Sequence, residues 1–306
     1  MVGYLFAGQG AQYVGMGKDL YESFPESKAV FDKADKVLGF SISKLCFTGP
    51  QEELTQTKNC QPAILTMSIA AWEAFKSRTA YSVQRTAYTA GLSLGEYSAL
   101  VAAEAISFED AVYLVRRRGE FMEEEALKQP GKMLSLIGLN LEKVREICAK
   151  TNTQVANINC PGQIVISGQA QEIEKAIKLA EDAGVKKAIL LEVSGAFHSS
   201  FMQGASLKLA KELDKIKMNK PKFSVISNVT AKAVTSRSEI ETNLVEQVAR
   251  SVLWEDSMKL ILSKGISNFM EFGPGKVLKG LMRRIEPKAE VINIEKKEDI
   301  TKLLNC

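Results

Sequence analysis

"TAGLSLGEYSAL" at residues 89–100 holds a G-x-S-x-G pattern around Ser93, and this stretch decides the fold. The letters of residues 86–91 are typical of a β-strand, and those of residues 94–105 are typical of a helix. A small residue in a tight turn would give the same pattern. A serine between a strand and a helix, however, is typical of a nucleophile held on a sharp turn beside free backbone N–H groups. The stretch therefore predicts an α/β fold with Ser93 as the candidate nucleophile.

The chain has one histidine, His198, in "SGAFHSSFM" at residues 194–202. A serine hydroxyl needs a base to take its proton, and imidazole has the ordinary pKa for that task at neutral pH. A lone histidine is often structural, but this one follows a predicted strand at a domain junction, where clefts form. No motif selects a carboxylate as a third partner, so an acid, an amide and a backbone carbonyl all stay open.

The middle of the chain predicts a small inserted domain at residues 127–195. Its pattern reads β-α-β-β-α-β, the order of a ferredoxin-like unit, with Pro161-Gly162 as the signal for a hairpin turn. We expect strands at 132–139, 154–160, 163–169 and 186–194, and helices at 140–151 and 171–184.

Strands and helices alternate on both sides of this insert, which predicts a discontinuous α/β domain with a parallel sheet, formed by residues 1–126 and 196–306. A helix at 61–77 is expected to hold Pro62 in its first turn. The other elements expected here are strands at 2–8, 223–228, 268–273 and 290–295, and helices at 27–39, 107–126, 238–250 and 255–264.

Composition narrows the class of protein. The chain has 306 residues, of which 45% are hydrophobic and 25% charged, the usual mix of a globular protein. No run of about 18 apolar residues predicts a membrane span. The N-terminus lacks the features of a signal peptide, so we expect a cytoplasmic protein, or an organellar one if a transit peptide has been removed. The net charge of +4 is too small to indicate nucleic acid, but it suits an anionic ligand or an acidic partner.

The cysteines predict neither disulfides nor a metal site. They are odd in number, lie far apart and form no C-x-x-C pair, and one histidine cannot build a histidine-rich site. We expect buried or incidental thiols at Cys46, Cys60, Cys148, Cys160 and Cys306.

Two further segments hold candidate binding residues. "GQGAQYVGMG" at 8–17 fails the dinucleotide pattern because Tyr13 stands where the third glycine is needed, but its loop offers a backbone N–H or Gln12 to a ligand. "RRRG" at 116–119 lies in a predicted helix, where Arg118 sits beside the apolar stripe. An inward arginine is suited to a carboxylate or a phosphate.

Six segments in order resemble the malonyl-CoA:acyl-carrier-protein transacylases, the acyltransferase family of fatty-acid and polyketide synthesis. They are GQGAQ (8–12), QPA (61–63), GLSLGEYSAL (91–100), RRRGEFM (116–122), GAFHS (195–199) and EFGPGKVLKGL (271–281). The resemblance covers nearly the whole chain. It implies an α/β-hydrolase-like domain with a ferredoxin-like insert, which agrees with the element pattern.

The resemblance also implies the parts of a catalytic centre. Ser93 would be the acylated nucleophile and His198 its general base and acid, with a backbone carbonyl as the partner of the imidazole. Gln12 and the backbone N–H of Leu94 would form the oxyanion hole.

A second group of matched residues would bind the substrate. Arg118 would hold the malonyl carboxylate, and the ring of Phe197 would leave little room for an α-methyl branch. Leu92 departs from the histidine that many members carry before the nucleophile, which changes the polar network of the pocket. The remaining substrate-binding candidates are Gln61, Met122, Asn228 and Gln247.

The implied reaction needs two substrates, a coenzyme A thioester and an acidic acyl carrier protein, and no bound cofactor or metal. We expect a monomer that binds neither nucleic acid nor a membrane. A basic run is expected either to meet the carrier or CoA phosphates or to form a solvated helix face, so that charge reversal at Arg283 and Arg284 would test the first reading. The run is Lys276, Lys279, Arg283 and Arg284.

Three alternatives stay open beside a transacylase of fatty-acid biosynthesis. One is a stand-alone acyltransferase that serves a polyketide synthase. The second is a serine thioesterase or hydrolase, against which Arg118 and the lack of a triad acid both count. The third is a non-catalytic carrier-binding subunit, against which the intact Ser93, His198 and Arg118 count.

Overall fold

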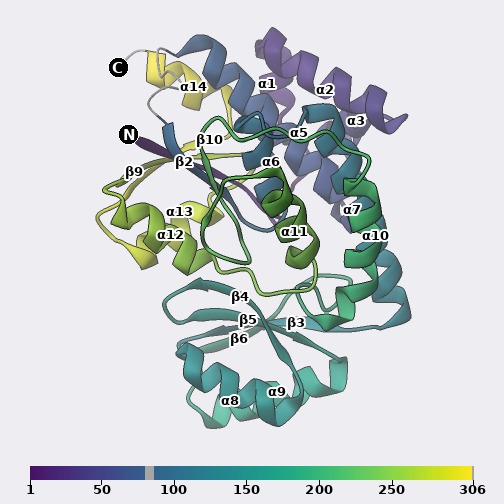
Figure 1. Ribbon diagram of the computed structural model, residues 1–306, viewed down its shortest axis with the longest axis vertical. Helices are drawn as coiled ribbons and strands as arrows, with labels where there is room; N and C mark the ends of the chain where they lie inside the picture. The colour runs from purple at the N-terminus through teal and green to yellow at the C-terminus, as the bar shows by residue number, and fades with distance from the viewer. Residues whose placement is uncertain (80–85, 305–306) are drawn as a thin grey trace.

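Strand β1 (Val2–Phe6) is the centre of the larger of two sheets, because its side chains are buried on both faces. The computed structural model describes residues 1–79 and 86–304, and in it this sheet has six strands (Figure 1). Their order is β10 (Glu290–Ile294), β9 (Asn268–Phe272), β1, β2 (Thr86–Gly91), β7 (Ser224–Ile226) and β8 (Ala233–Val234).

The sheet is parallel except at one edge. The pairs β10–β9, β9–β1, β1–β2 and β2–β7 are parallel, whereas β7 and β8 are antiparallel. The wholly parallel sheet expected from the sequence is therefore corrected at this edge. The turn between β7 and β8 is short and closed by a hydrogen bond from the Ser227 N–H to the Lys232 carbonyl (2.9 Å), and a parallel pair would need a long crossover.

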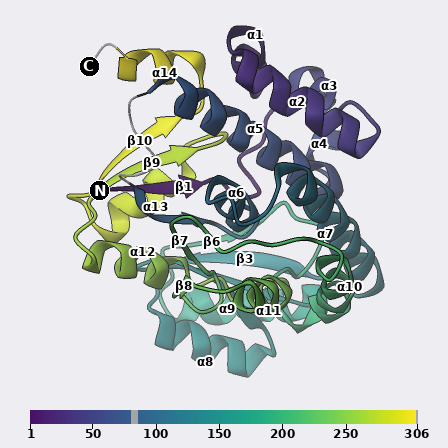
Figure 2. The same ribbon diagram turned by 45° about the horizontal axis from the view of Figure 1, so that its top comes forward.

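Two layers of helices cover the large sheet (Figure 2). On one face Tyr4 and Phe6 of β1 pack against Trp72 of the long helix α5 (Thr57–Arg78). On the other face Leu5 belongs to the same apolar cluster as Trp254 and Leu278, which lie at α12 (Trp254–Ser263) and α13 (Val277–Ile285). Alternation along one strand thus builds a three-layer α/β/α domain.

The remaining helices of this domain follow the chain. They are α1 (Lys18–Ser23), α2 (Pro25–Leu38), α3 (Ile42–Thr48), α4 (Gln51–Thr55), α6 (Gly95–Ala102), α7 (Phe108–Lys128), η2 (Ser200–Met202), α10 (Gln203–Leu213), α11 (Arg237–Gln247) and α14 (Lys297–Leu304).

One helix begins earlier than the sequence predicts. The expected start of α5 put Pro62 in the first turn, but the helix begins at Thr57 and Pro62 lies inside it. Nearly every residue from Thr57 to Phe75 is buried, so tertiary packing on all sides holds a helix that proline alone would interrupt.

The small sheet comes from the insert and has the order β4 (Gln154–Cys160), β5 (Gln163–Gly168), β3 (Lys132–Ile137), β6 (Lys187–Leu190). All of its pairs are antiparallel, and the first and fourth strands of the β-α-β-β-α-β unit are neighbours, as in a ferredoxin-like fold. Strand β6 is shorter than the expected 186–194. Helices α8 (Leu141–Thr151) and α9 (Ala170–Asp182) cover one face of this sheet (Figure 1).

The opposite face of the small sheet packs on the large domain. Leu134 and Ile166 belong to the cluster under α8 and α9, whereas Met133 and Val165 belong to the cluster of the large domain. The insert is therefore fixed to its host by an apolar interface. Its strands lie within residues 127–195, and these residue numbers stay our prediction for the domain boundaries.

No helix within residues 1–79 and 86–304 is long and apolar enough to cross a membrane. Four of the five cysteines lie in this described part, where all four are free and buried, and Cys306 lies outside it.

Candidate active site

The carboxyl ends of the parallel strands place Ser93 at the edge of the large sheet. Phe6 of β1 is in register with Gly91 of β2, so the loops after these strands leave the sheet together. A Cβ atom on Gly91 would lie 2.0 Å from the Gly95 carbonyl oxygen, and one on Gly95 would lie 2.2 Å from the Phe6 carbonyl oxygen. Only glycine permits this tight crossing from β2 into α6. Ser93 at its apex has a φ of 51°, the left-handed conformation of a nucleophile elbow.

His198 is in direct contact with the serine. Its Nε2 lies 2.8 Å from Ser93 Oγ, and its Nδ1 lies 2.8 Å from the main-chain oxygen of Gln247. A carbonyl can only accept, so Nδ1 carries the proton and Nε2 is the base that accepts from the serine hydroxyl. The third partner that the sequence left open is thus a backbone carbonyl.

The environment keeps His198 neutral. Burial lowers the pKa of the imidazole to about 4, and the nearby Arg118 guanidinium lowers it further by repelling a second positive charge. The ring is therefore an unprotonated base across the neutral pH range.

Arg118 reaches the serine from α7. It is 1% exposed, and its Nη2 donates to Ser93 Oγ at 3.1 Å. A Cβ atom on Gly119 would lie 2.6 Å from Lys58 Cα, so α7 passes very close to the start of α5. That close approach brings Arg118 Nη1 to within 2.8 Å of Gln61 Oε1.

The guanidinium has no counter-ion. Within the described residues Arg118 makes no salt bridge, and its buried Nε has no hydrogen-bond partner. The two arginines before it, Arg116 and Arg117, instead pair with Glu120 at the helix surface. A buried, uncompensated guanidinium beside a nucleophile is a site for an anionic group of a ligand.

Gln247 and Asn228 hold the elbow from the opposite side. Gln247 Oε1 accepts from Arg118 Nη2 at 3.0 Å, and its Nε2 donates to the Ser93 carbonyl at 2.9 Å. Asn228 Oδ1 accepts from the Ser93 N–H at 2.6 Å, and its Nδ2 donates to the Gly91 carbonyl at 2.8 Å. Both amides are fully buried, so they fix the main chain of the turn.

Sequence reasoning missed Glu96. This carboxylate is 2% exposed, accepts from Gln247 Nε2 at 2.6 Å and from the Asn228 N–H at 3.2 Å, and so joins the two amides. The available signal was a single acidic residue in an otherwise apolar run, three residues after the serine. A capping role at the start of α6 would have been the ordinary reading of that position.

The candidate oxyanion donors lie around the elbow. Leu94 is the residue before α6, and its N–H donates to no acceptor in the described part of the chain. A Cβ atom on Gly8 would lie 2.5 Å from the Leu92 carbonyl oxygen, so the loop after β1 presses against the turn. Gln12 belongs to this loop, but its side chain accepts from the Gly10 N–H at 2.9 Å, which leaves its backbone N–H as the group that would face an oxyanion.

Two apolar residues complete the set of candidates. Phe197 precedes His198, is 4% exposed and is anchored by a hydrogen bond from Ser167 Oγ to its carbonyl (2.6 Å). Met122 lies one turn after Arg118, and its Sδ is 3.5 Å from Gln61 Nε2. The structure thus joins Ser93, His198, Arg118, Gln61, Met122, Gln247 and Asn228 by direct contacts.

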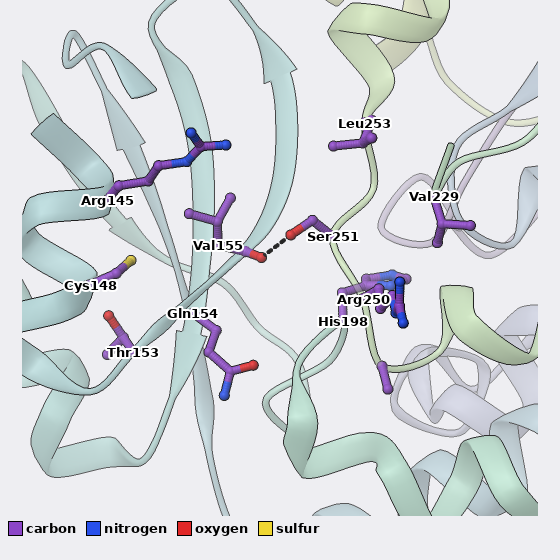
Figure 3. Close-up of a pocket in the computed structure, with 11 residues that line it drawn as sticks. Arg145, Cys148, Thr153, Gln154, Val155, His198, Val229, Arg250, Ser251 and Leu253 are labelled. Atoms are coloured by element: carbon purple, nitrogen blue, oxygen red, sulfur yellow. Dashed lines mark hydrogen bonds between the residues drawn. The ribbon is translucent and has the colours of Figure 1, made fainter. Parts of the chain in front are cut away.

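A cavity of about 500 Å³ opens onto this centre between the two domains. Figure 3 shows Arg145, Gln154 and Val155 on the insert side and His198 and Arg250 across from them. Its size is in the range of small-molecule sites. Residues 1–79 and 86–304 contain no cluster of histidine, cysteine or acidic side chains suited to a metal ion.

Comparisons with known proteins agree on one family. The acyl transferase domain model matches residues 3–295. The chain is 46% identical to the malonyl CoA-acyl carrier protein transacylase of Bacillus subtilis (strain 168) over 304 residues, which cover 98% of this chain and 95% of that protein.

Two solved structures share the fold over nearly their full length. The acyl-carrier-protein-S-malonyltransferase of Bartonella henselae superposes with a TM-score of 0.96 at 37% identity, covering 100% of both chains. A malonyl-transacylase solved in complex with its type II PKS acyl-carrier protein gives a TM-score of 0.95 at 35% identity, covering 99% of both chains.

Proposed function

Because the chain belongs to the malonyl-CoA:acyl-carrier-protein transacylases of the acyl transferase family, we propose that Ser93 carries the malonyl group between two thiols. The enzyme moves malonyl from coenzyme A to the phosphopantetheine thiol of an acyl carrier protein. One observation carries the assignment of the site: Ser93 Oγ contacts a neutral imidazole at 2.8 Å and a buried guanidinium at 3.1 Å.

In the first half-reaction Ser93 Oγ attacks the thioester carbonyl while His198 Nε2 takes the hydroxyl proton. The Gln247 carbonyl, 2.8 Å from Nδ1, supports the imidazolium that forms. The C–S bond then breaks, the proton passes from His198 to the leaving thiolate, and free coenzyme A departs. Malonyl remains as an ester on Ser93.

The tetrahedral intermediate needs donors for its oxyanion. The backbone N–H groups of Leu94 and Gln12 are our candidates, since one begins α6 and the other lies on the loop packed against the elbow. Fixed donors of this kind stabilise the transition state by about 3 kcal/mol each.

Arg118 selects the acyl group. A malonyl carboxylate would take the unpartnered Nε and would draw the guanidinium from Ser93 Oγ, which frees the nucleophile. An acetyl group offers no such partner and would leave the buried cation unpaired, a difference on the order of 10⁴ in favourable cases. We assign Gln61, Gln247 and Asn228 to holding this arrangement, Met122 to the pocket wall, and the ring of Phe197 to excluding an α-methyl branch.

The second half-reaction reverses the first with the carrier thiol as nucleophile and His198 as its base. Arg145 and Arg250 at the cavity offer positive charge to the phosphate that coenzyme A and the carrier arm share. The basic run at α13 is our candidate for the acidic carrier, with one revision. Arg284 donates to Gln163 Oε1 at 2.6 Å and to the Pro161 carbonyl at 3.2 Å, so it holds the hairpin of the insert. Lys276, Lys279 and Arg283 are exposed and remain for the partner.

A hydrolase is the competing activity. The buried Arg118 favours transfer, because hydrolysis of a thioester needs no carboxylate partner in the acyl group. We propose the fatty-acid pathway. The neighbour solved with a type II PKS carrier keeps a polyketide pathway as the second candidate, to be separated by comparing carriers from the two pathways as acceptors. A monomer, a cytoplasmic location and the absence of a cofactor stay predictions.

Intact-protein mass spectrometry tests the proposal directly. The purified chain is mixed with malonyl-CoA, and holo carrier protein is added afterwards. We expect a malonyl adduct that forms on the wild type but not on Ser93→Ala, persists in buffer and moves to the carrier. An adduct that decays to free malonate at the same rate with and without carrier would identify a hydrolase instead.

A further inference from the structure

We propose that Glu96 is a positioning residue that acts through Gln247 to hold Arg118 ready for the carboxylate of the acyl group. The inference rests on the proposed function and extends it to a residue that does not touch the substrate. It starts from the amide of Gln247, which lies between the only buried acid and the only buried arginine of this site.

The amide of Gln247 has one satisfactory orientation. Its Nε2 donates to Glu96 Oε2 at 2.6 Å and to the Ser93 carbonyl at 2.9 Å, and its Oε1 accepts from Arg118 Nη2 at 3.0 Å. A flipped amide would turn an oxygen toward two acceptors and an NH₂ group toward a cation. Glu96 is the one ionisable group among these acceptors, so its charge makes the observed orientation strongly favoured.

Arg118 depends on that orientation. Its contacts are two glutamine oxygens and the serine hydroxyl, none of them charged. Glu96 is the nearest source of negative charge and acts across the intervening amide. The relay compensates the buried guanidinium without occupying it, and this leaves Arg118 free to pair with a carboxylate of the substrate.

The protonation state of Glu96 makes the role measurable. Burial raises the pKa of its carboxyl to about 7, against the lowering effects of the Gln247 amide, the Asn228 N–H and Arg118. Arg118 on α7 is the charged group that faces it, and the titratable neighbour on its own helix is Tyr97, whose phenol has a pKa raised by burial. His198 titrates near pH 4, so it does not change charge in this range.

The sign of the pH dependence follows. Above pH 7 Glu96 is a carboxylate and the relay is complete, whereas below pH 7 it is a neutral acid and a weaker acceptor. We expect kcat/KM for malonyl-CoA, which reports groups of the free enzyme, to rise with pH through about 7 in the wild type.

Glu96→Gln removes the charge but keeps a carbonyl oxygen for both donors, and Glu96→Ala removes the acceptor as well. We expect the KM for malonyl-CoA to rise about tenfold in Glu96→Gln and further in Glu96→Ala, with the limb near pH 7 absent from both profiles. The rate at which a fluorophosphonate phosphonylates Ser93, with loss of fluoride, should stay within about threefold of wild type in Glu96→Gln, because that reaction needs no carboxylate partner.

Glu271→Gln is the matched control. Glu271 is fully buried and accepts from the N–H groups of Leu278 and Lys279 and from Asn293 Nδ2, at 2.8–2.9 Å, at the start of α13. Loss of that charge is expected to lower the melting temperature without changing the KM or the pH profile.

Two results would overturn the inference: a KM and pH profile of Glu96→Gln equal to wild type, or equal shifts in Glu271→Gln. A wild type that forms no malonyl adduct would instead refute the proposed function, so the two failures are distinguishable.

Discussion

Arg118 and Arg283 are the same residue type in two opposite settings. Arg118 is buried among neutral oxygens between two domains, whereas Arg283 lies on the exposed face of α13. A buried guanidinium is costly to leave unpaired, so each contact it makes or loses has a large effect on binding. An exposed one is screened by water and salt and mainly affects how partners meet. The interior of this enzyme therefore sets which acyl group reacts, and its surface sets how often a partner arrives.

The strongest test of the interior is the base itself. His198→Ala should lower kcat/KM for malonyl transfer by about 10⁴-fold or more, because the Ser93 proton then has no acceptor. Transfer is followed with malonyl-CoA and holo carrier protein, and a thermal melt checks that the variant is folded. A loss of less than tenfold would mean that the 2.8 Å contact between these residues is not part of the reaction.

The next effect concerns selectivity. Arg118→Ala should lower kcat/KM for malonyl-CoA by about 10³-fold while acetyl-CoA is affected far less, so that the ratio between the two substrates collapses. Arg117→Ala is the matched control on the same helix, since its pairing with Glu120 is at the surface. We expect that control to stay within about twofold of wild type. Equal losses for both acyl groups would contradict the selective role of Arg118.

The smallest effect belongs to the surface. Arg283→Glu should raise the KM for carrier protein a few-fold, about three to ten, and added salt should abolish the difference. Arg284 is left unchanged, because it holds the insert through Gln163 and Pro161. Lys211→Glu on α10 serves as the control for a general change in net charge. Equal KM values for the Arg283 and Lys211 variants would remove α13 as the docking face.

The same contrast separates what the sequence could and could not predict. Local signals were sufficient for the elbow at Ser93, for the cap of α7 by Ser107, and for the end of α2 at Gly39. Each depends on neighbours within a few residues, so the letters alone carry the physics. Arg118 was also predictable, because its place beside an apolar stripe gave its direction on the helix.

The contacts around Gln247 needed the folded chain. Its carbonyl meets His198 and its amide meets Glu96 and Arg118, across separations of 49 to 151 residues. No local pattern reports such pairings. The position of Pro62 inside α5 was missed for a related reason, since burial by distant elements outweighed the cost of proline in a helix. Long-range packing of this kind also decided that the base would lean on a carbonyl rather than on an acid.

The chain's single histidine lies between Ser93 and the Gln247 carbonyl. Every imidazole resonance in an NMR spectrum of this protein therefore comes from the catalytic centre, with no assignment needed. Labelling with ring-¹⁵N histidine would show the tautomer, the loss of the serine contact on acylation and the return of that contact after transfer. The enzyme carries a native spectroscopic probe at the atom where its proton moves.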